Sequence, residues 1–168
     1  MDKDRRTFLE LSSELTGYSP IDLEGTGLVD EYRKLVEYEV GKNVTDLLYQ
    51  TARSVLDKKS GEERDRTMHI NIMASAILWP ICQNLVVLWY RGQWSSMSSI
   101  WYKYYARVSP PSKVAPGKTF VPSTQSYTQQ LCYKAAGAHP PGANPTGFGT
   151  WGLDPVFGDF AKHNRKRQ

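Results

Sequence analysis

The stretch from Met68 to Tyr90 contains no charged residue, and it reads MHINIMASAILWPICQNLVVLWY. A stretch of this kind is buried in a membrane, in the core of its own chain, or against another protein. It is long enough for a membrane-spanning helix, which needs about 20 mostly apolar residues. Polar residues such as Asn71 and Gln83 are spread along it, however, and Pro80 lies near its middle. We therefore expect a core helix kinked at Pro80, with a membrane anchor as the alternative.

A helix is expected near the N-terminus. Phe8, Leu11 and Leu15 fall on one helical face, and Gly17 is placed to end the helix. The preceding Arg5-Arg6 pair looks like part of a twin-arginine export signal. Such a signal requires an apolar stretch after the arginines, whereas an amphipathic pattern follows here. We therefore assign this segment to a helix and not to a signal.

Capping residues predict three more helices before residue 93. The first begins at Ser19-Pro20, where Ser is a favoured cap and Pro suits the first turn, and it extends to residue 40. Asn43 is expected to cap the next helix. Ser60 and Glu63 form a capping box for the fourth, which carries residues 68–90 and ends near Gly92.

The C-terminal part has a different composition. Residues 109–122 are rich in Pro and Lys and predict a loop, and residues 124–136 predict one short helix. The segment that follows is rich in Gly and Pro, yet it contains large apolar side chains at intervals. Because disordered segments are usually poor in aromatic residues, we expect an arm that lies on a surface. The anchors on which this prediction depends are Phe148, Trp151, Leu153, Val156, Phe157 and Phe160.

These patterns predict an all-α protein. A bundle-like domain of four to five helices occupies residues 1–106. Residues 107–168 form a loop, a short helix and an extended, irregular arm rich in Pro, Gly and aromatic residues.

No pattern in the sequence indicates catalytic, cofactor-binding or metal-binding residues. The histidines are isolated, and Cys82 and Cys132 lack the spacing of a metal motif. Residues 147–152 match G-x-G-x-x-G, but no strand precedes them and no helix follows. The net charge of +4 is mild, and its charges are mostly interleaved, so we expect no nucleic-acid partner. A self-contained enzyme would need a cofactor pocket for which the sequence gives no sign.

Three stretches share one resemblance: FLELSSELTG at residues 8–17, LWYRG at residues 88–92, and Tyr133 with Pro145, Gly147, Phe148 and Trp151. Together they resemble one protein family, the small subunits of bacterial FAD-dependent sugar and polyol dehydrogenase complexes. Residues 8–17, FLELSSELTG, resemble the F-x-x-L-S-x-x-L-T-G opening of these subunits. Residues 88–92, LWYRG, are similar to their A-W-Y-x-G helix ending. Tyr133 followed by Pro145, Phe148 and Trp151 is similar to their closing Y…P-x-x-(F/Y)-W pattern.

The resemblance implies a non-catalytic accessory subunit. Its large partner is a flavoprotein of the glucose–methanol–choline type that oxidises a sugar, polyol or glycoside and passes electrons to a cytochrome c or a quinone. FAD is then held by the partner and not by this chain, and no direct membrane span is implied. The small subunit assists maturation and export, and its C-terminal part lies on the large subunit. The interface residues that we predict are Trp89, Tyr90, Gly92, Tyr133, Pro145, Phe148, Trp151 and Phe157.

The sequence departs from this family in three respects, one of which is that the segment 94–122 is longer than is usual in the family. Some members place a cysteine in the C-terminal arm, and residues 137–141 contain none. The chain also shows no export signal. The resemblance implies a periplasmic location if this is a processed form, and a cytoplasmic one if Met1 is the native start.

Overall fold

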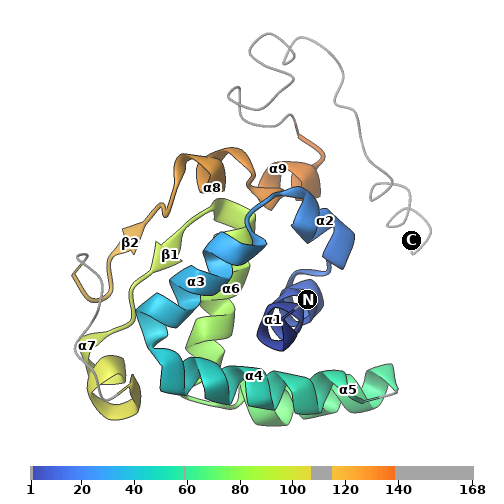
Figure 1. Ribbon diagram of the computed structural model, residues 1–168, viewed down its shortest axis with the longest axis vertical. Coiled ribbons are helices and arrows are strands. Elements are labelled where there is room, and N and C mark those ends of the chain that lie inside the picture. The colour runs from blue at the N-terminus through green and yellow to red at the C-terminus, as the bar shows by residue number, and fades with distance from the viewer. Residues whose placement is uncertain (1, 59, 107–114, 139–168) are drawn as a thin grey trace, which may run out of the picture.

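The computed structural model describes residues 2–58, 60–106 and 115–138, and this part of the chain is mostly helical, with two short strands (Figure 1). The prediction of an all-α protein is confirmed. The predicted arm lies outside the described residues.

The helices are joined by short connections, and one small sheet accompanies them. Strands β1 and β2 are antiparallel, with Trp94 opposite Phe120. The elements in chain order are α1 (Lys3–Thr16), α2 (Pro20–Gly25), α3 (Val29–Val40), α4 (Lys42–Leu56), α5 (Gly61–Met68), the π-helix η1 (His69–Met73), α6 (Trp79–Arg91), β1 (Trp94–Ser95), α7 (Ser99–Trp101), the π-helix η2 (Tyr102–Ala106), β2 (Thr119–Phe120), α8 (Thr124–Thr128) and α9 (Leu131–Ala136).

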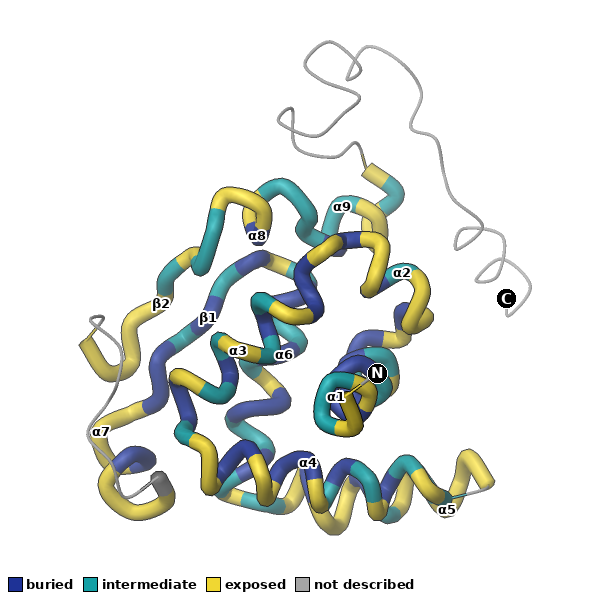
Figure 2. Tube along the Cα trace, viewed as in Figure 1, coloured by how far each residue is buried: buried dark blue, intermediate teal, exposed yellow. Residues whose placement is uncertain are grey.

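Helices α1 and α6 pack against each other and against most other elements. Helix α1 contacts α2, α3, α4 and α6, while α6 also contacts β1, α8 and α9. The buried residues of α6, Ile81, Cys82, Leu85, Leu88 and Trp89, recur every three or four positions. This spacing directs one face of the helix into the core. Figure 2 shows the same pattern as dark blue segments where neighbouring helices face one another.

The uncharged stretch does not form one kinked helix, so that prediction is wrong. It is divided between the end of α5, η1, a turn and α6. Pro80 lies in the first turn of α6, where its missing N–H costs no helical hydrogen bond. The hydroxyl of Ser75 accepts hydrogen bonds from the backbone N–H groups of Ile77 (3.3 Å) and Leu78 (3.1 Å) in the preceding turn. Within the described ranges, none of the helices combines the length and the apolar character that a membrane crossing requires.

Most of the predicted helix ends are confirmed. Gly17 and Gly92 end α1 and α6 in the left-handed conformation. Ser19 and Ser60 accept hydrogen bonds from the backbone N–H groups three residues further on, as N-caps do.

Three predicted boundaries are wrong. The segment expected as one helix from residue 19 to 40 is two helices, because Gly27 has φ 71° and breaks the helical backbone. Helix α4 begins at Lys42, and its N-cap is Gly41 instead of the predicted Asn43. The segment 124–136 is two short helices, α8 and α9, separated by Gln129 and Gln130.

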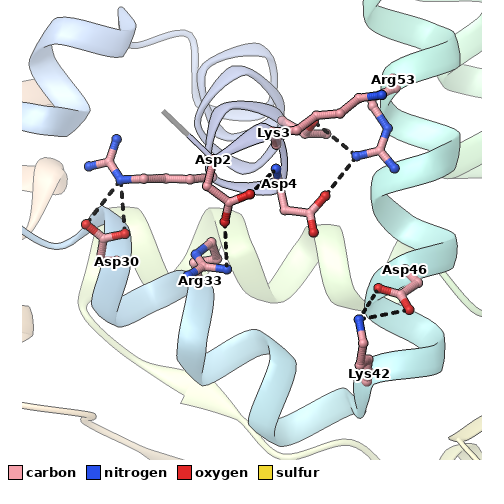
Figure 3. A network of polar contacts seen from close by, with 10 residues as sticks. Asp2, Lys3, Asp4, Asp30, Arg33, Lys42, Asp46 and Arg53 are labelled. Atoms are coloured by element: carbon pink, nitrogen blue, oxygen red, sulfur yellow. Dashed lines mark hydrogen bonds and ion pairs between the residues drawn. The ribbon is translucent and has the colours of Figure 1, made fainter.

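Ion pairs connect α1 to its neighbours (Figure 3). Arg5 donates to both carboxylate oxygens of Asp30 on α3, at 3.0 and 3.1 Å, and to both of Glu24 on α2, at 2.6 and 2.8 Å. Asp4 pairs with Arg53 on α4 at 3.0 Å. The guanidinium of Arg5 also holds the pKa of Glu24 below its ordinary value. Arg5 therefore joins three helices through fork-like contacts of the kind that arginine favours.

We expect Arg5→Met to lower the free energy of unfolding by about 1 kcal/mol, since both carboxylates are partly exposed and screened by solvent. A lowered folded-state pKa stabilises the fold above the ordinary value of 4.5 and loses this effect as the pH falls through the folded value. The difference between wild type and variant should therefore shrink below pH 4.5. Urea unfolding over a pH series measures it, with the exposed Lys34→Met as control. A difference that is constant with pH would contradict the assignment.

Candidate partner-binding site

The C-terminal ends of α1 and α6 meet α8 and α9 in a group of contacts that we call the junction. The hydroxyl of Tyr90 donates to the carbonyl oxygen of Thr16 at 2.8 Å. The hydroxyl of Tyr18 donates to the carbonyl oxygen of Leu131 at 3.2 Å. The two tyrosine rings pack edge to face with centroids 5.9 Å apart. The junction, defined by Thr16, Tyr18, Tyr90, Gly92, Ser126 and Leu131, thus connects residues from both ends of the described chain.

Gly92 lies at the tightest contact of the junction. It is buried, and its φ of 61° is one that favours glycine. A Cβ atom at this position would lie 2.1 Å from the carbonyl oxygen of Ser126 and 2.6 Å from its carbonyl carbon. The backbone of α8 therefore rests directly on the end of α6, and only a residue without a side chain fits between them.

Two further contacts connect α8 and α9 to the N-terminal helices. The amide of Gln125 donates to the carbonyl oxygen of Thr26 at 2.9 Å. Lys134 pairs with Asp22 on α2 at 2.6 Å, and its ammonium lies 5.5 Å from the centre of the Tyr18 ring. This lysine lowers the pKa of Asp22 by hydrogen bonding to the carboxylate. Residues 124–138 are therefore part of the packed helical body.

The predicted interface residues that the structure describes fall into two groups. Tyr90 and Tyr133 are half-buried, whereas Gly92 is buried against α8. Trp89 is 1% exposed, and its ring packs edge to face on Tyr32 with centroids 4.8 Å apart. Trp89 and Gly92 thus pack inside this chain and leave almost no surface for a partner. The other predicted residues, Pro145, Phe148, Trp151 and Phe157, lie outside the described residues.

Tyr18, Ser126 and Leu131 belong to this site and were not among the predicted site residues. Tyr18 follows the predicted helix end at Gly17, which was a usable signal, because the residue after a glycine cap often packs back on its helix. Ser126 and Leu131 contribute backbone carbonyl groups to the junction, and these carry no residue-specific signal.

A cleft of about 330 Å³ lies between α1, α2 and the connection from α4 to α5. Its arginines are already engaged, since Arg6 pairs with Glu10 at 2.8 Å and Arg64 with Glu14 at 3.5 Å. Over the described ranges, His, Cys, Asp and Glu residues form no group of three that could hold a metal ion. The cleft therefore gives no geometric indication of a particular chemistry.

The two cysteines are free thiols in different surroundings. Cys82 is buried in α6, and burial raises its pKa to about 12, while Cys132 is half-buried on α9. A nucleophilic cysteine needs a thiolate near neutral pH, and Cys82 is far from that condition.

We expect a thiol reagent such as DTNB to label Cys132 in the folded protein at neutral pH and to reach Cys82 only after unfolding. The protein should release one equivalent of chromophore when folded and two in guanidinium. In Cys132→Ser, labelling of the folded protein should cease. Rapid reaction of folded Cys132→Ser would contradict the burial of Cys82.

No protein-family model, curated protein or solved structure matches this chain.

Proposed function

We propose that this chain is a non-catalytic accessory subunit. In this proposal it binds, stabilises and assists the maturation and export of a flavin-dependent sugar, polyol or glycoside dehydrogenase of the glucose–methanol–choline type. FAD belongs to the large catalytic partner, a cytochrome c can complete the complex, and the complex works in the periplasm. The chain itself supplies packing surface and no reacting group.

The observation that supports this proposal best is the convergence of the family-like stretches. Residues 8–17 form most of α1, residues 88–92 end α6, and Tyr133 lies on α9. Helix α6 contacts both α1 and α9. This arrangement is the one expected if the three stretches preserve a common architecture, as the family resemblance implies.

The proposed partner surface begins at the junction. Tyr133 is half-buried on α9, and the predicted anchors Pro145, Phe148, Trp151 and Phe157 follow it in the sequence. A large aromatic side chain at the centre of an interface typically contributes about 2–4 kcal/mol, as measured by truncation to alanine. The proposal therefore assigns most of the binding energy to the residues that follow α9.

Co-purification of the tagged chain from its native host tests the proposal. We expect a second, larger polypeptide with the yellow absorption of a flavin. Trp151→Ala should weaken this complex by more than about tenfold. His163→Ala is the matched control, because it removes a smaller polar ring near the same chain end and should leave the yield unchanged.

Recovery of the wild-type chain as a lone monomer would contradict the proposal. Turnover of a sugar by the purified chain with FAD and a dye acceptor would favour an enzyme instead.

A further inference from the structure

The net charge of +4 conceals an uneven distribution of acidic residues. Of the 17 Asp and Glu residues, only Asp154 and Asp159 follow Asp65. The expectation that the charges are interleaved is therefore wrong for the C-terminal half of the chain. Strong charge asymmetry between the halves of a chain is typical of proteins that meet a nucleic acid or a membrane, or that carry a charged tail. The acid-free stretch 66–153 carries Arg66, Arg91, Lys103, Arg107, Lys113, Lys118 and Lys134.

Four of these cations are exposed and without an ion pair in the described part of the chain. They are Arg66, Arg91, Lys103 and Lys118. In the N-terminal half, by contrast, arginines such as Arg5, Arg6 and Arg53 pair with carboxylates at 3.0 Å or less. The second half thus presents positive charge that the fold itself does not neutralise. Lys103 lies on η2, whereas Arg91 precedes Gly92 at the end of the molecule where α8 packs.

Most of the exposed apolar side chains come from four elements, α4, η1, α7 and η2, which we call together the apolar end. The π-helices η1 and η2 both pack against α4, and the indole N–H of Trp101 donates to the carbonyl oxygen of Ile77 at 3.3 Å. Helix α7 accordingly lies beside the start of α4, at the end opposite to α8 and α9 (Figure 1). Six of the ten exposed large hydrophobic residues come from these elements: Leu47, Ile70, Met73, Ile100, Tyr104 and Tyr105.

Helices α7 and η2 carry both exposed apolar side chains and an exposed cation. Ile100 is 70% exposed and Tyr104 is 64% exposed. Lys103 lies between them in sequence, and its ammonium is 5.6 Å from the centre of the Tyr104 ring. Residues 98–106 include no carboxylate that would repel a phosphate group, and the carboxylate of Asp46, next to Leu47 on α4, is paired with Lys42 at 2.9 Å.

We propose that the apolar end binds the surface of an anionic lipid bilayer. Aliphatic and tyrosine side chains fit the boundary between headgroups and acyl chains, and lysine and arginine fit the phosphates just above it. A nucleic acid would leave Ile70, Met73 and Ile100 without a suitable contact, since these side chains carry no ring on which a base could stack. The attachment is peripheral, and it does not depend on the proposed role as an accessory subunit.

Flotation of the full chain with lipid vesicles tests this proposal. We expect binding to vesicles of mixed phosphatidylglycerol and phosphatidylcholine, weaker binding in high salt, and little binding to pure phosphatidylcholine. Lys103→Gln should weaken binding to the mixed vesicles about fivefold. The double variant Ile100→Ser/Tyr104→Ser should weaken it by about tenfold or more. Ile21→Ser is the matched control: Ile21 is 84% exposed but lies on α2, and its loss should change nothing.

Three results would overturn the proposal. The first is an absence of binding to the anionic vesicles. The second is unchanged binding of both Lys103→Gln and the double variant, which would place the contact elsewhere, for instance in the basic residues 162–167. The third is binding to single-stranded RNA or to an acidic protein in place of the vesicles. A normal unfolding midpoint for each variant excludes misfolding as the cause of a loss.

Discussion

Replacing Gly92 by alanine should destabilise the protein by about 3–5 kcal/mol, the largest effect that we expect from any single methyl group in this chain. Two costs add together. An L-residue at a φ of 61° costs about 1–2 kcal/mol. The new Cβ would also lie 2.1 Å from the carbonyl oxygen of Ser126, so α8 must move away from α6. Urea or thermal unfolding, followed by circular dichroism, measures the loss.

Gly17→Ala separates these two costs. Gly17 ends α1 with φ 75°, and a Cβ there would meet no atom within 4 Å. This variant should therefore lose only the backbone contribution of about 1–2 kcal/mol. Equal losses in the two variants would mean that α8 does not rest on Gly92 in solution. If Gly92→Ala loses little stability and binds the flavoprotein partner normally, then the junction is not part of the proposed partner-binding architecture.

Trp89→Ala should cost about 3–5 kcal/mol, because truncation of a buried indole leaves a large cavity in the core. Trp89 is 1% exposed and packs edge to face on Tyr32. Its indole N–H has no hydrogen-bond partner among the described residues, so Trp89→Phe should be much milder, at about 1–2 kcal/mol. Denaturant unfolding of the isolated chain measures both values.

The control for Trp89 is Tyr127→Ala on α8. Tyr127 is 50% exposed, so its truncation should change stability by less than about 1 kcal/mol. The comparison also tests the role of Trp89 in binding. If Trp89→Ala is as stable as wild type but no longer binds the partner, then Trp89 is an interface residue, as its sequence motif predicts. That result would contradict its placement in the core.

Helix ends that depend on neighbouring residues were predictable. Gly17, Ser19, Ser60 and Gly92 act at the positions expected from their spacing. These caps depend on a side-chain oxygen or a left-handed glycine within a few residues, and such information is local. The amphipathic pattern of α1 was equally local.

The division of the uncharged stretch was not predictable in the same way. Composition showed that residues 68–90 had to be largely buried, but a proline at its middle is compatible with a kink or with a new helix. In the structure, η1 packs against α4 while α6 packs against α1, and this packing divides the stretch into two helical segments. As a result, Ile70 and Met73 are exposed, whereas Ile81 and Leu85 are buried.

In the candidate site, too, residue types were predictable from the sequence, but their contacts were not. Gly92 was singled out from its motif, but its closest contact is the backbone of Ser126, which any residue would supply. Trp89 was placed at a partner surface and lies in the core, because an aromatic side chain suits either environment and only the neighbouring helices decide between them.

The sequence by itself determined the helical class, the positions of most helix ends and the absence of acidic residues from 66 to 153, since each depends on residue types and short spacings. Only the tertiary structure decided which aromatic residues are internal, why Gly92 has no side chain, and which apolar side chains stay exposed. These features depend on contacts between residues far apart in the chain, and such contacts are fixed only when the whole set of helices packs.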